Sequence, residues 1–219
     1  MKILFVGSSS EIAKRLLKTL NFEVYGISRK NYSKYKKVYL LNKYNLSEIK
    51  KVIKKIDIKF DNVFIFNGAY QLSLLKYFNI KRFNEDININ FSSSILIINN
   101  LIKENKIKNR GSINFISSHA GIYPEVGNAY YSISKNMINF AIAILTKEYK
   151  KSSIRFNSLL VGFIKTKMSS KILDIYSDKQ KIKILKKQNN KFISIKKLTE
   201  FIKKICNEKK YSNKKIYID

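Results

Sequence analysis

Short runs of β-branched and aromatic residues alternate with longer amphipathic stretches along almost the entire chain. The runs have the length of strands, and the stretches place apolar residues at the three- and four-residue spacing of helices. Because a helix between two strands returns the chain to the same edge of a sheet, this alternation favours parallel pairing. The sequence therefore predicts an α/β fold, a doubly wound parallel sheet with helices on both faces.

The expected elements follow one another without an internal repeat or a linker rich in Pro, Gly or Ser. Strands are expected at residues 2–6, 22–28, 37–41, 62–66, 112–116, 155–160 and 215–218, and helices at 11–20, 47–56, 83–103, 129–149 and 197–207. We therefore expect a single domain over residues 1–219. In this fold class ligands bind beyond the carboxyl ends of the strands, so the loops after the strands are expected to carry the chemistry.

Glycine gathers at that edge of the predicted sheet. The chain has only seven glycines, of which Gly7, Gly68 and Gly162 come just after expected strands. Gly121 and Gly127 lie in the loop after the strand expected at 112–116. A composition poor in glycine keeps this residue where backbone geometry requires it, so the pattern supports a ligand site there.

The chain is strongly basic, with 44 Lys and Arg against 15 Asp and Glu and a formal charge of +29. Only five of the basic residues are Arg, and the lysines are spread over the whole sequence. Nucleic-acid binders usually cluster their cations and use Arg for base and phosphate contacts. A codon bias toward Lys, Asn and Ile explains the charge better, so we expect no specific nucleic-acid partner. A basic nucleic-acid or anionic-surface binder remains an alternative.

Single residues and apolar runs exclude further classes. One cysteine, Cys206, excludes a disulfide framework, and one histidine, His119, excludes a multi-His metal site, so no metal is expected. No apolar run approaches the ~18–20 residues of a membrane span, and the first residues are too few for a signal-peptide core. We expect a protein of the reducing cytoplasm.

The first two strands are followed by residues suited to a dinucleotide. Gly7 begins a turn of three serines, and a helix follows from Glu11, so backbone amides and the Ser9 and Ser10 hydroxyls can cradle a pyrophosphate. After the second strand, Ser28 is followed by Arg29 and Lys30 instead of the carboxylate that binds the ribose of NAD. Two cations suit a 2′-phosphate, so NADP(H) is preferred and NAD(H) possible.

The fifth strand and the helix after it carry a candidate catalytic set. Tyr131 and Lys135 are four residues apart and therefore share one helix face, and Ser118 lies at the mouth of the preceding strand. An ammonium beside a phenol is expected to lower the pKa of Tyr131, which could then exchange a proton with an alcohol or carbonyl oxygen. Ser118 could hydrogen-bond the same oxygen.

These motifs together resemble the short-chain dehydrogenase/reductase family, and the resemblance covers most of the chain. Ser118 with Tyr131 and Lys135 matches the family's catalytic Ser and YxxxK, and Asn90 matches its helical Asn. The other matching segments are Gly7–Ala13, Asn45–Ser47, Asn67–Ala69 and Arg155–Thr166. Six motifs in the family's order imply a Rossmann-like fold and a nicotinamide cofactor.

The resemblance also implies roles. Tyr131 would be the acid or base, Lys135 would lower its pKa and hold the nicotinamide ribose, and Asn90 would anchor a water of a proton relay. Cofactor contacts are expected from Gly7, Ser9, Ser10, Ile12, Ser28, Arg29, Asn45, Asn67, Gly68, Ala69, Tyr131, Lys135, Gly162, Ile164 and Thr166. The substrate would be a small carbonyl or alcohol compound, neutral or anionic, under a covering segment at about 169–191. A homodimer or homotetramer through the two long helices is also implied.

Four positions depart from the family's pattern. Glu11 and Ala13 replace loop glycines, Val161 replaces a proline and Asn45 an aspartate. Glu11 would repel a pyrophosphate if its side chain pointed inward. A non-catalytic dinucleotide sensor or scaffold on the same fold is therefore a second alternative, and an epimerase or dehydratase acting on a nucleotide sugar is a third.

Overall fold

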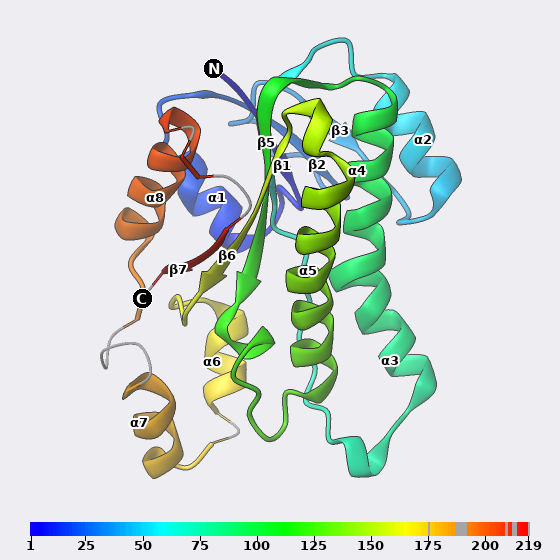
Figure 1. The fold of residues 1–219 in the computed structure, drawn as a ribbon. Helices are drawn as coiled ribbons and strands as arrows, with labels where there is room; N and C mark the ends of the chain where they lie inside the picture. The colour runs from blue at the N-terminus through cyan, green and yellow to red at the C-terminus, as the bar shows by residue number, and fades with distance from the viewer. Residues whose placement is uncertain (175, 187–191, 209, 212–213, 219) are drawn as a thin grey trace.

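Parallel strands form one central sheet in the structure, a computed structural model that describes residues 1–174, 176–186, 192–208, 210–211 and 214–218 (Figure 1). Within these residues seven strands pair in the order β3-β2-β1-β4-β5-β6-β7, and all neighbours are parallel. The strands are β1 (Lys2–Val6), β2 (Glu23–Ser28), β3 (Val38–Leu40), β4 (Phe60–Ile65), β5 (Ile107–Ser118), β6 (Arg155–Val161) and β7 (Lys215–Ile218). The predicted doubly wound parallel sheet is confirmed, and its order reverses between β1 and β4.

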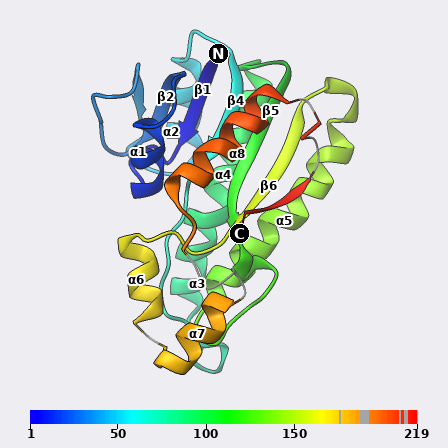
Figure 2. The ribbon, with the colours of Figure 1, turned by 90° about the vertical axis from the view of Figure 1, so that its left-hand side faces the viewer.

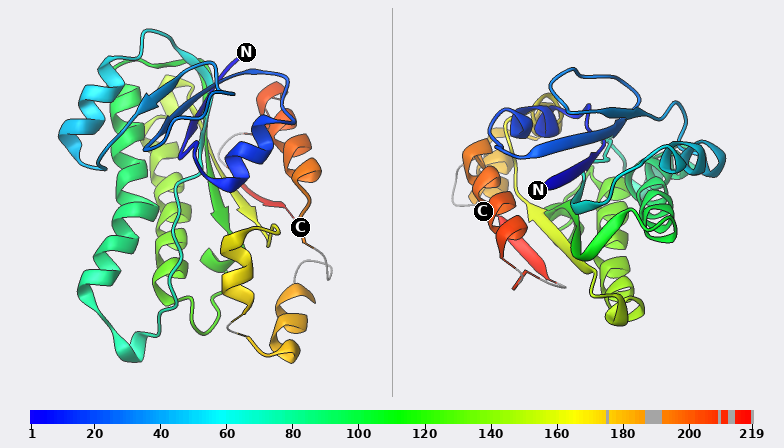
Figure 3. Two further views of the ribbon diagram at one scale, coloured as in Figure 1. Left: turned by 180° about the vertical axis from the view of Figure 1, so that it is seen from behind. Right: turned by 90° about the horizontal axis from the view of Figure 1, so that it is seen from above.

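Helices cover both faces of the sheet. They are α1 (Glu11–Leu17), α2 (Leu46–Lys54), α3 (Ile80–Ile87), α4 (Ser93–Lys103), α5 (Ala129–Glu148), α6 (Lys167–Leu173), α7 (Asp178–Lys186) and α8 (Ile195–Asn207). Figure 2 shows α8 in front of the sheet, with α6 and α7 beyond the ends of the strands. From above, α1 and α8 lie on one face and α2, α4 and α5 on the other (Figure 3).

The alternation of side chains along β1 explains the two layers of helices. Ile3 and Phe5 point into the core under α1 and α8, and Leu4 and Val6 point into the core under α2, α4 and α5. All four side chains are fully buried. A strand that is apolar on both faces is stable only between two layers, so the sequence of β1 itself requires this architecture.

Several element boundaries differ from the prediction. The long helix expected at 83–103 begins at Ile80 and contains a π-helical turn, Asn88–Ser92, between α3 and α4. The strand expected at 112–116 begins at Ile107, and an irregularity in its pairing with β4 accompanies a positive φ at Arg110. The helix expected at 11–20 ends at Leu17. A bulge or a π-turn shifts the apolar pattern by a single residue, and this small shift is hard to recognise in a sequence.

The expected covering segment, 169–191, contains most of α6 and all of α7. Residues 175 and 187–191 of this segment lie outside the described residues. No helix was expected from the sequence in this segment, which is short and rich in lysine. Among the helices of the described chain, none combines the length and apolarity that crossing a membrane requires.

Candidate active site

A cavity of about 210 Å³ opens at the carboxyl ends of the strands. Its walls come from the loops after β1, β4, β5 and β6, from the start of α5 and from α6. Of the residues that the sequence singled out, those in the wall are Ser10, Ile12, Asn67, Gly68, Ser118, Tyr131, Lys135, Gly162, Ile164 and Thr166. The cavity lies where the strand order reverses, which is the place where this fold class binds ligands.

Lys135 is the most buried charged group of the cavity. Its side chain is 3% exposed, and Nζ donates hydrogen bonds to the carbonyl oxygens of Ile116 (3.1 Å) and Asn67 (3.5 Å). Burial lowers the pKa of the Lys135 ammonium to about 8. The two carbonyls come from the ends of β5 and β4, so the ammonium is fixed by the backbone at the edge of the sheet.

Tyr131 lies beside Lys135 on the same face of α5. The Lys135 Nζ is 5.6 Å from the centre of the Tyr131 ring. Burial raises the pKa of the Tyr131 phenol, and a hydrogen bond with the Ser118 side chain partly offsets this effect. The expected net lowering of the Tyr131 pKa was therefore wrong, because burial has the larger effect.

Asn90 connects the loop after β4 to the helices behind it. Its Oδ1 accepts from the Ala69 amide (2.7 Å), and its Nδ2 donates to the Ala69 carbonyl (3.1 Å) and to Ser134 Oγ (3.0 Å). Asn90 is fully buried in the π-helical turn. Its side chain thereby fixes the loop whose Asn67 carbonyl receives the Lys135 ammonium.

The loop after β1, which is the expected pyrophosphate cradle, lies tightly against the loop after β4. Gly7 has φ +75°, and a Cβ at this position would lie 2.6 Å from Asn67 Oδ1. The Gly7 and Ser8 amides donate to the Ile27 carbonyl, and Ser10 Oγ accepts from the Ala13 amide. Ser9 lies in the same turn, partly exposed. Only glycine combines this backbone conformation with such a close approach of the β4 loop.

The residues expected near the adenosine end lie outside the cavity wall. Ser28 is buried and donates through Oγ to the Lys30 carbonyl, and Arg29 is exposed at the end of β2. Burial raises the pKa of Tyr44, and the charge of Arg29 acts against this increase. Asn45 Oδ1 accepts from the Glu48 amide (2.9 Å) and so caps α2.

The loop after β6 forms the opposite wall. Gly162, Ile164 and Thr166 line the cavity, and Ile164 is almost completely buried. Thr166 caps α6 in a reciprocal capping box with Ser169. Ser10, Asn45 and Thr166 are thus all helix caps, which explains why residues typical of cofactor loops also read as ordinary capping signals.

Some wall residues were missed by the sequence analysis. Glu125 and Tyr176 line the outer part of the cavity, and Tyr176 Oη donates to the Val126 carbonyl (2.7 Å). Tyr176 lies in the covering segment, for which no helix was expected, and no motif spacing in the sequence connects it to Glu125. Within the described chain, no group of three or more His, Cys, Asp or Glu side chains could hold a metal ion.

Comparison with known proteins decides the family. The model of the short chain dehydrogenase family matches residues 6–176, which is most of the chain. The chain belongs to this family. Within it, the 3-oxoacyl-(acyl-carrier-protein) reductase FabG of Thermotoga maritima is 29% identical over 138 residues. The match covers 61% of this chain and spans only 56% of that relative's length.

Solved structures show the same fold. A short chain dehydrogenase family protein of Francisella tularensis superimposes with a TM-score of 0.86 at 21% identity, over 100% of this chain and 96% of that one. A 4-hydroxyisoleucine dehydrogenase complexed with NADH superimposes with a TM-score of 0.85 at 20% identity, over 100% of this chain and 97% of that one. An actinorhodin polyketide ketoreductase with NADPH superimposes with a TM-score of 0.82 at 14% identity, over 99% of this chain and 95% of that one. At these identities the likeness concerns the fold.

Proposed function

We propose that this short-chain dehydrogenase is an oxidoreductase that interconverts a carbonyl and an alcohol with NADP(H), or less favourably NAD(H). One observation carries the proposal: a phenol, a hydroxyl bonded to it and a buried ammonium meet in one cavity, from Tyr131, Ser118 and Lys135. Family membership supports the same class of reaction.

The residues present fit a dinucleotide. Asn67 Oδ1 is buried and has no hydrogen-bond partner among the described residues, and it lies directly against the Gly7 turn. Gly68 leaves space beside the ammonium, because a Cβ there would lie 3.6 Å from Lys135 Nζ. Gly7–Ile12, Asn67–Ala69 and Gly162–Thr166 would hold the cofactor. A bound nicotinamide supplies the hydride that the substrate carbon exchanges.

Tyr131 is the proton donor in this proposal. Because burial raises the pKa of its phenol, Oη keeps its proton at neutral pH and can transfer it to a substrate oxygen that becomes an alkoxide. Ser118 Oγ, bonded to the same phenol, directs that oxygen toward Oη. In oxidation of an alcohol, the phenolate is the base.

Lys135 makes the loss of that proton less costly. Its ammonium, with a pKa of about 8, is mostly charged at neutral pH and lies beside the ring that becomes a phenolate. An opposite charge at this range in a buried site favours the ionised phenol. Asn90 holds the loop carbonyl that fixes the ammonium, and we assign to it the proton-relay position implied by the family.

The preference for NADP(H) rests on the end of β2. Arg29 and Lys30 are exposed there, and the Ser28 hydroxyl is already bonded to the backbone. Two cations suit a ribose 2′-phosphate better than a 2′-hydroxyl.

The substrate is proposed to be a carbonyl compound that enters under α6. Lys165, Lys167 and Lys171 are exposed on α6 and just before it, which suits a substrate with an anionic part. Glu125 also lines the cavity, and the anionic part would lie away from its carboxylate. Since the Thermotoga relative is named for a 3-oxoacyl substrate, 3-oxoacyl thioesters are the first compounds to test.

Assembly through the long helices is also proposed. On α5, Phe140 is 69% exposed and Ile144 is 44% exposed, which is unusual for large apolar side chains on one helix. Light scattering of the purified chain tests whether it is a dimer or a tetramer.

Replacing the phenol of Tyr131 tests the proposed function. Fluorescence titration with NADPH and then NADH, at low and moderate salt, measures binding, and turnover is assayed with 3-oxoacyl thioesters and neutral ketones. We expect Tyr131→Phe to bind NADPH like the wild type and to lose turnover by about 10²-fold or more. Tyr130→Phe is the matched control, because its hydroxyl accepts from the Asn79 amide outside the cavity wall.

Three outcomes would contradict the proposal. Near-normal turnover in Tyr131→Phe would remove the assigned acid. Saturable nucleotide binding without turnover of any carbonyl compound would favour the non-catalytic sensor. Nucleotide binding that moderate salt abolishes, with equal affinity for unrelated polyanions, would favour the basic binder.

A further inference from the structure

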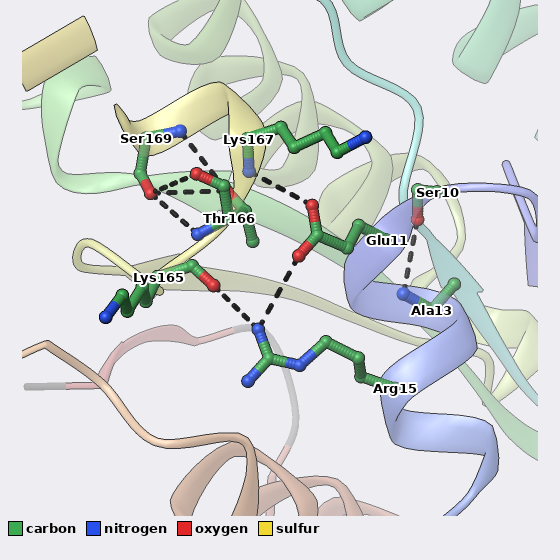
Figure 4. Close-up of polar contacts among 8 residues, drawn as sticks. All are labelled: Ser10, Glu11, Ala13, Arg15, Lys165, Thr166, Lys167 and Ser169. Carbon is green, nitrogen blue, oxygen red and sulfur yellow. Dashed lines mark hydrogen bonds and ion pairs between the residues drawn. The ribbon is translucent and has the colours of Figure 1, made fainter. Parts of the chain in front are cut away.

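Glu11 stands where the family's cofactor loop has a glycine, yet its carboxylate reaches across to the other side of the cavity. Oε2 accepts a hydrogen bond from the Lys167 amide (3.1 Å), at the first residue of α6 (Figure 4). The two residues are 156 positions apart in the sequence. This bond therefore joins the loop after β1 to the loop after β6.

Arg15, one turn further along α1, makes a second connection to the same loop. Its Nη1 donates to the Lys165 carbonyl (2.7 Å) and lies 3.8 Å from Glu11 Oε1. Figure 4 shows the two side chains side by side, between α1 and the segment that begins α6. We call Glu11 and Arg15, with their two backbone partners, the clasp.

The two backbone bonds carry the clasp, not the ion pair. The side chains of Arg15 and Glu11 are 41% and 43% exposed, and an ion pair of 3.8 Å at such exposure adds little stability. Hydrogen bonds between a charged group and a backbone amide or carbonyl are stronger than neutral ones, and the bond from Arg15 is also short, at 2.7 Å. They also point to specific atoms, so they fix the position of the β6–α6 loop along α1.

Both loops joined by the clasp line the cavity. Ser10, Glu11 and Ile12 come from one side, and Gly162, Ile164 and Thr166 from the other. Thr166 and Ser169 already cap α6 internally, so the clasp is not needed to form this helix, only to place it. The clasp thus sets the separation of two walls of the proposed cofactor site.

We propose that Glu11 and Arg15 are positioning residues that hold the β6–α6 loop closed over the dinucleotide. This inference rests on the proposed function, because it takes the cavity to be the cofactor site. The carboxylate that would repel a phosphate in the cradle is bonded to α6 instead, so the replacement of glycine strengthens nucleotide retention. If Glu11 repels the nucleotide, removing its carboxylate should slow the dissociation of NADPH. If Glu11 forms the clasp, removing the carboxylate should make dissociation faster.

The first test needs no nucleotide. Hydrogen exchange is measured by mass spectrometry on peptides that cover residues 162–173, in the wild type, Glu11→Ala, Glu11→Gln and Arg15→Ala. We expect exchange of these peptides to increase by about tenfold in Glu11→Ala and in Arg15→Ala. Glu11→Gln keeps an oxygen that accepts from the Lys167 amide, and its exchange should lie close to the wild type. Glu200→Ala, an exposed glutamate on α8, is the matched control and should change nothing.

The second test measures nucleotide retention. Stopped-flow displacement gives the dissociation rate of NADPH from each protein. The clasp predicts a rate about tenfold higher in Glu11→Ala and Arg15→Ala, a smaller increase in Glu11→Gln, and a higher KM for NADPH at nearly constant kcat. Repulsion predicts slower dissociation in both Glu11 variants.

The two tests separate the inference from the function beneath it. If the wild type binds neither NADPH nor NADH, the proposed function fails, while hydrogen exchange still decides whether the clasp holds α6. If the wild type binds and all variants exchange and dissociate like it, the clasp is overturned. Tighter binding in Glu11→Ala and Glu11→Gln also overturns it, in favour of repulsion.

Discussion

Single buried ionisable groups are the residues at which this chain departs most from an ordinary α/β core. Lys135 is an example, because burial lowers its pKa from 10.5 to about 8. In the unfolded chain the ammonium keeps its ordinary pKa, so between these two values the unfolded state holds a proton that the folded state has lost. The folded state therefore becomes relatively more stable as the pH rises from about 8 to about 10.5.

This linkage predicts how Lys135→Met compares with the wild type. At neutral pH both states of the wild type are charged, and the full cost of burying the ammonium is present. As the pH rises toward about 10, the free energy of unfolding of the wild type should increase by on the order of 3 kcal/mol relative to that of the variant. Urea unfolding of both proteins at neutral pH and near pH 10 measures the difference. A difference that does not change with pH would mean that Lys135 is not charged and buried as described.

Asp86 on α3 is a second such group. It is fully buried, and neither carboxylate oxygen has a hydrogen-bond partner among the described residues. Burial raises its pKa, and the charge of Arg82 acts against this increase. Because the folded-state pKa is above the unfolded value, stability falls as the pH rises through the interval between them.

We expect Asp86→Asn to stabilise the protein at neutral pH, by about 1–3 kcal/mol, since an unpaired buried carboxylate costs more than a neutral amide. The gain should shrink as the pH falls toward about 4, because the raised pKa lets the folded wild type take up its carboxyl proton before the unfolded chain does. Glu200→Gln, at an exposed position on α8, is the control and should show neither effect. Equal stability of Asp86→Asn and wild type at both pH values would be evidence of an ionised carboxylate with a partner.

The candidate site illustrates what single residues disclose in a sequence. Ser118, Tyr131 and Lys135 could be chosen because their spacing places them on one loop and one helix face, which is local information. The pKa of Tyr131 was predicted with the wrong sign, since burial depends on the whole fold. The Glu11 contact with Lys167 was not predictable either, because nothing local relates residues so far apart in the chain.

At the scale of elements, the π-helical turn between α3 and α4 is the feature that the sequence concealed. Strands and long helices were predicted from apolar periodicity, and β1 and β7 match the expected bounds. The π-turn has no such signal, because one inserted residue shifts the pattern by less than a full helix face. Its effect is to aim Asn90 at the backbone of Ala69.

Replacing Asn90 by alanine therefore tests whether the π-helical turn anchors the loop after β4. The variant loses three hydrogen bonds and removes the Asn90 partner from both the amide and the carbonyl of the partly buried Ala69. We expect a loss of about 2–4 kcal/mol in the free energy of unfolding and weaker binding of NADPH. Asn99→Ala, on the exposed face of α4, should change stability by less than about 0.5 kcal/mol. Similar urea midpoints for the two variants would show that the turn does not anchor the loop.

At the scale of the whole molecule, charge is the dominant property. With 44 basic and 15 acidic residues, at least 29 basic side chains lack an acid of their own. Ion pairs among the described residues, such as Lys108–Asp61, are correspondingly few. Like charges spread over a compact surface repel one another, and unfolding relieves that repulsion by moving them apart.

Salt should therefore stabilise this protein. Raising NaCl from about 20 to about 300 mM shortens the Debye length from roughly 20 Å to roughly 6 Å, which is less than the spacing of many surface lysines. We expect the Tm, measured by calorimetry, to rise by several degrees, and choline chloride at equal ionic strength to act alike, because screening is not specific to the cation. A Tm that stays constant would show that the lysines are too far apart to interact. If NADPH raises the Tm by the same amount at both salt concentrations, its binding depends on the cradle and the clasp more than on the general positive charge.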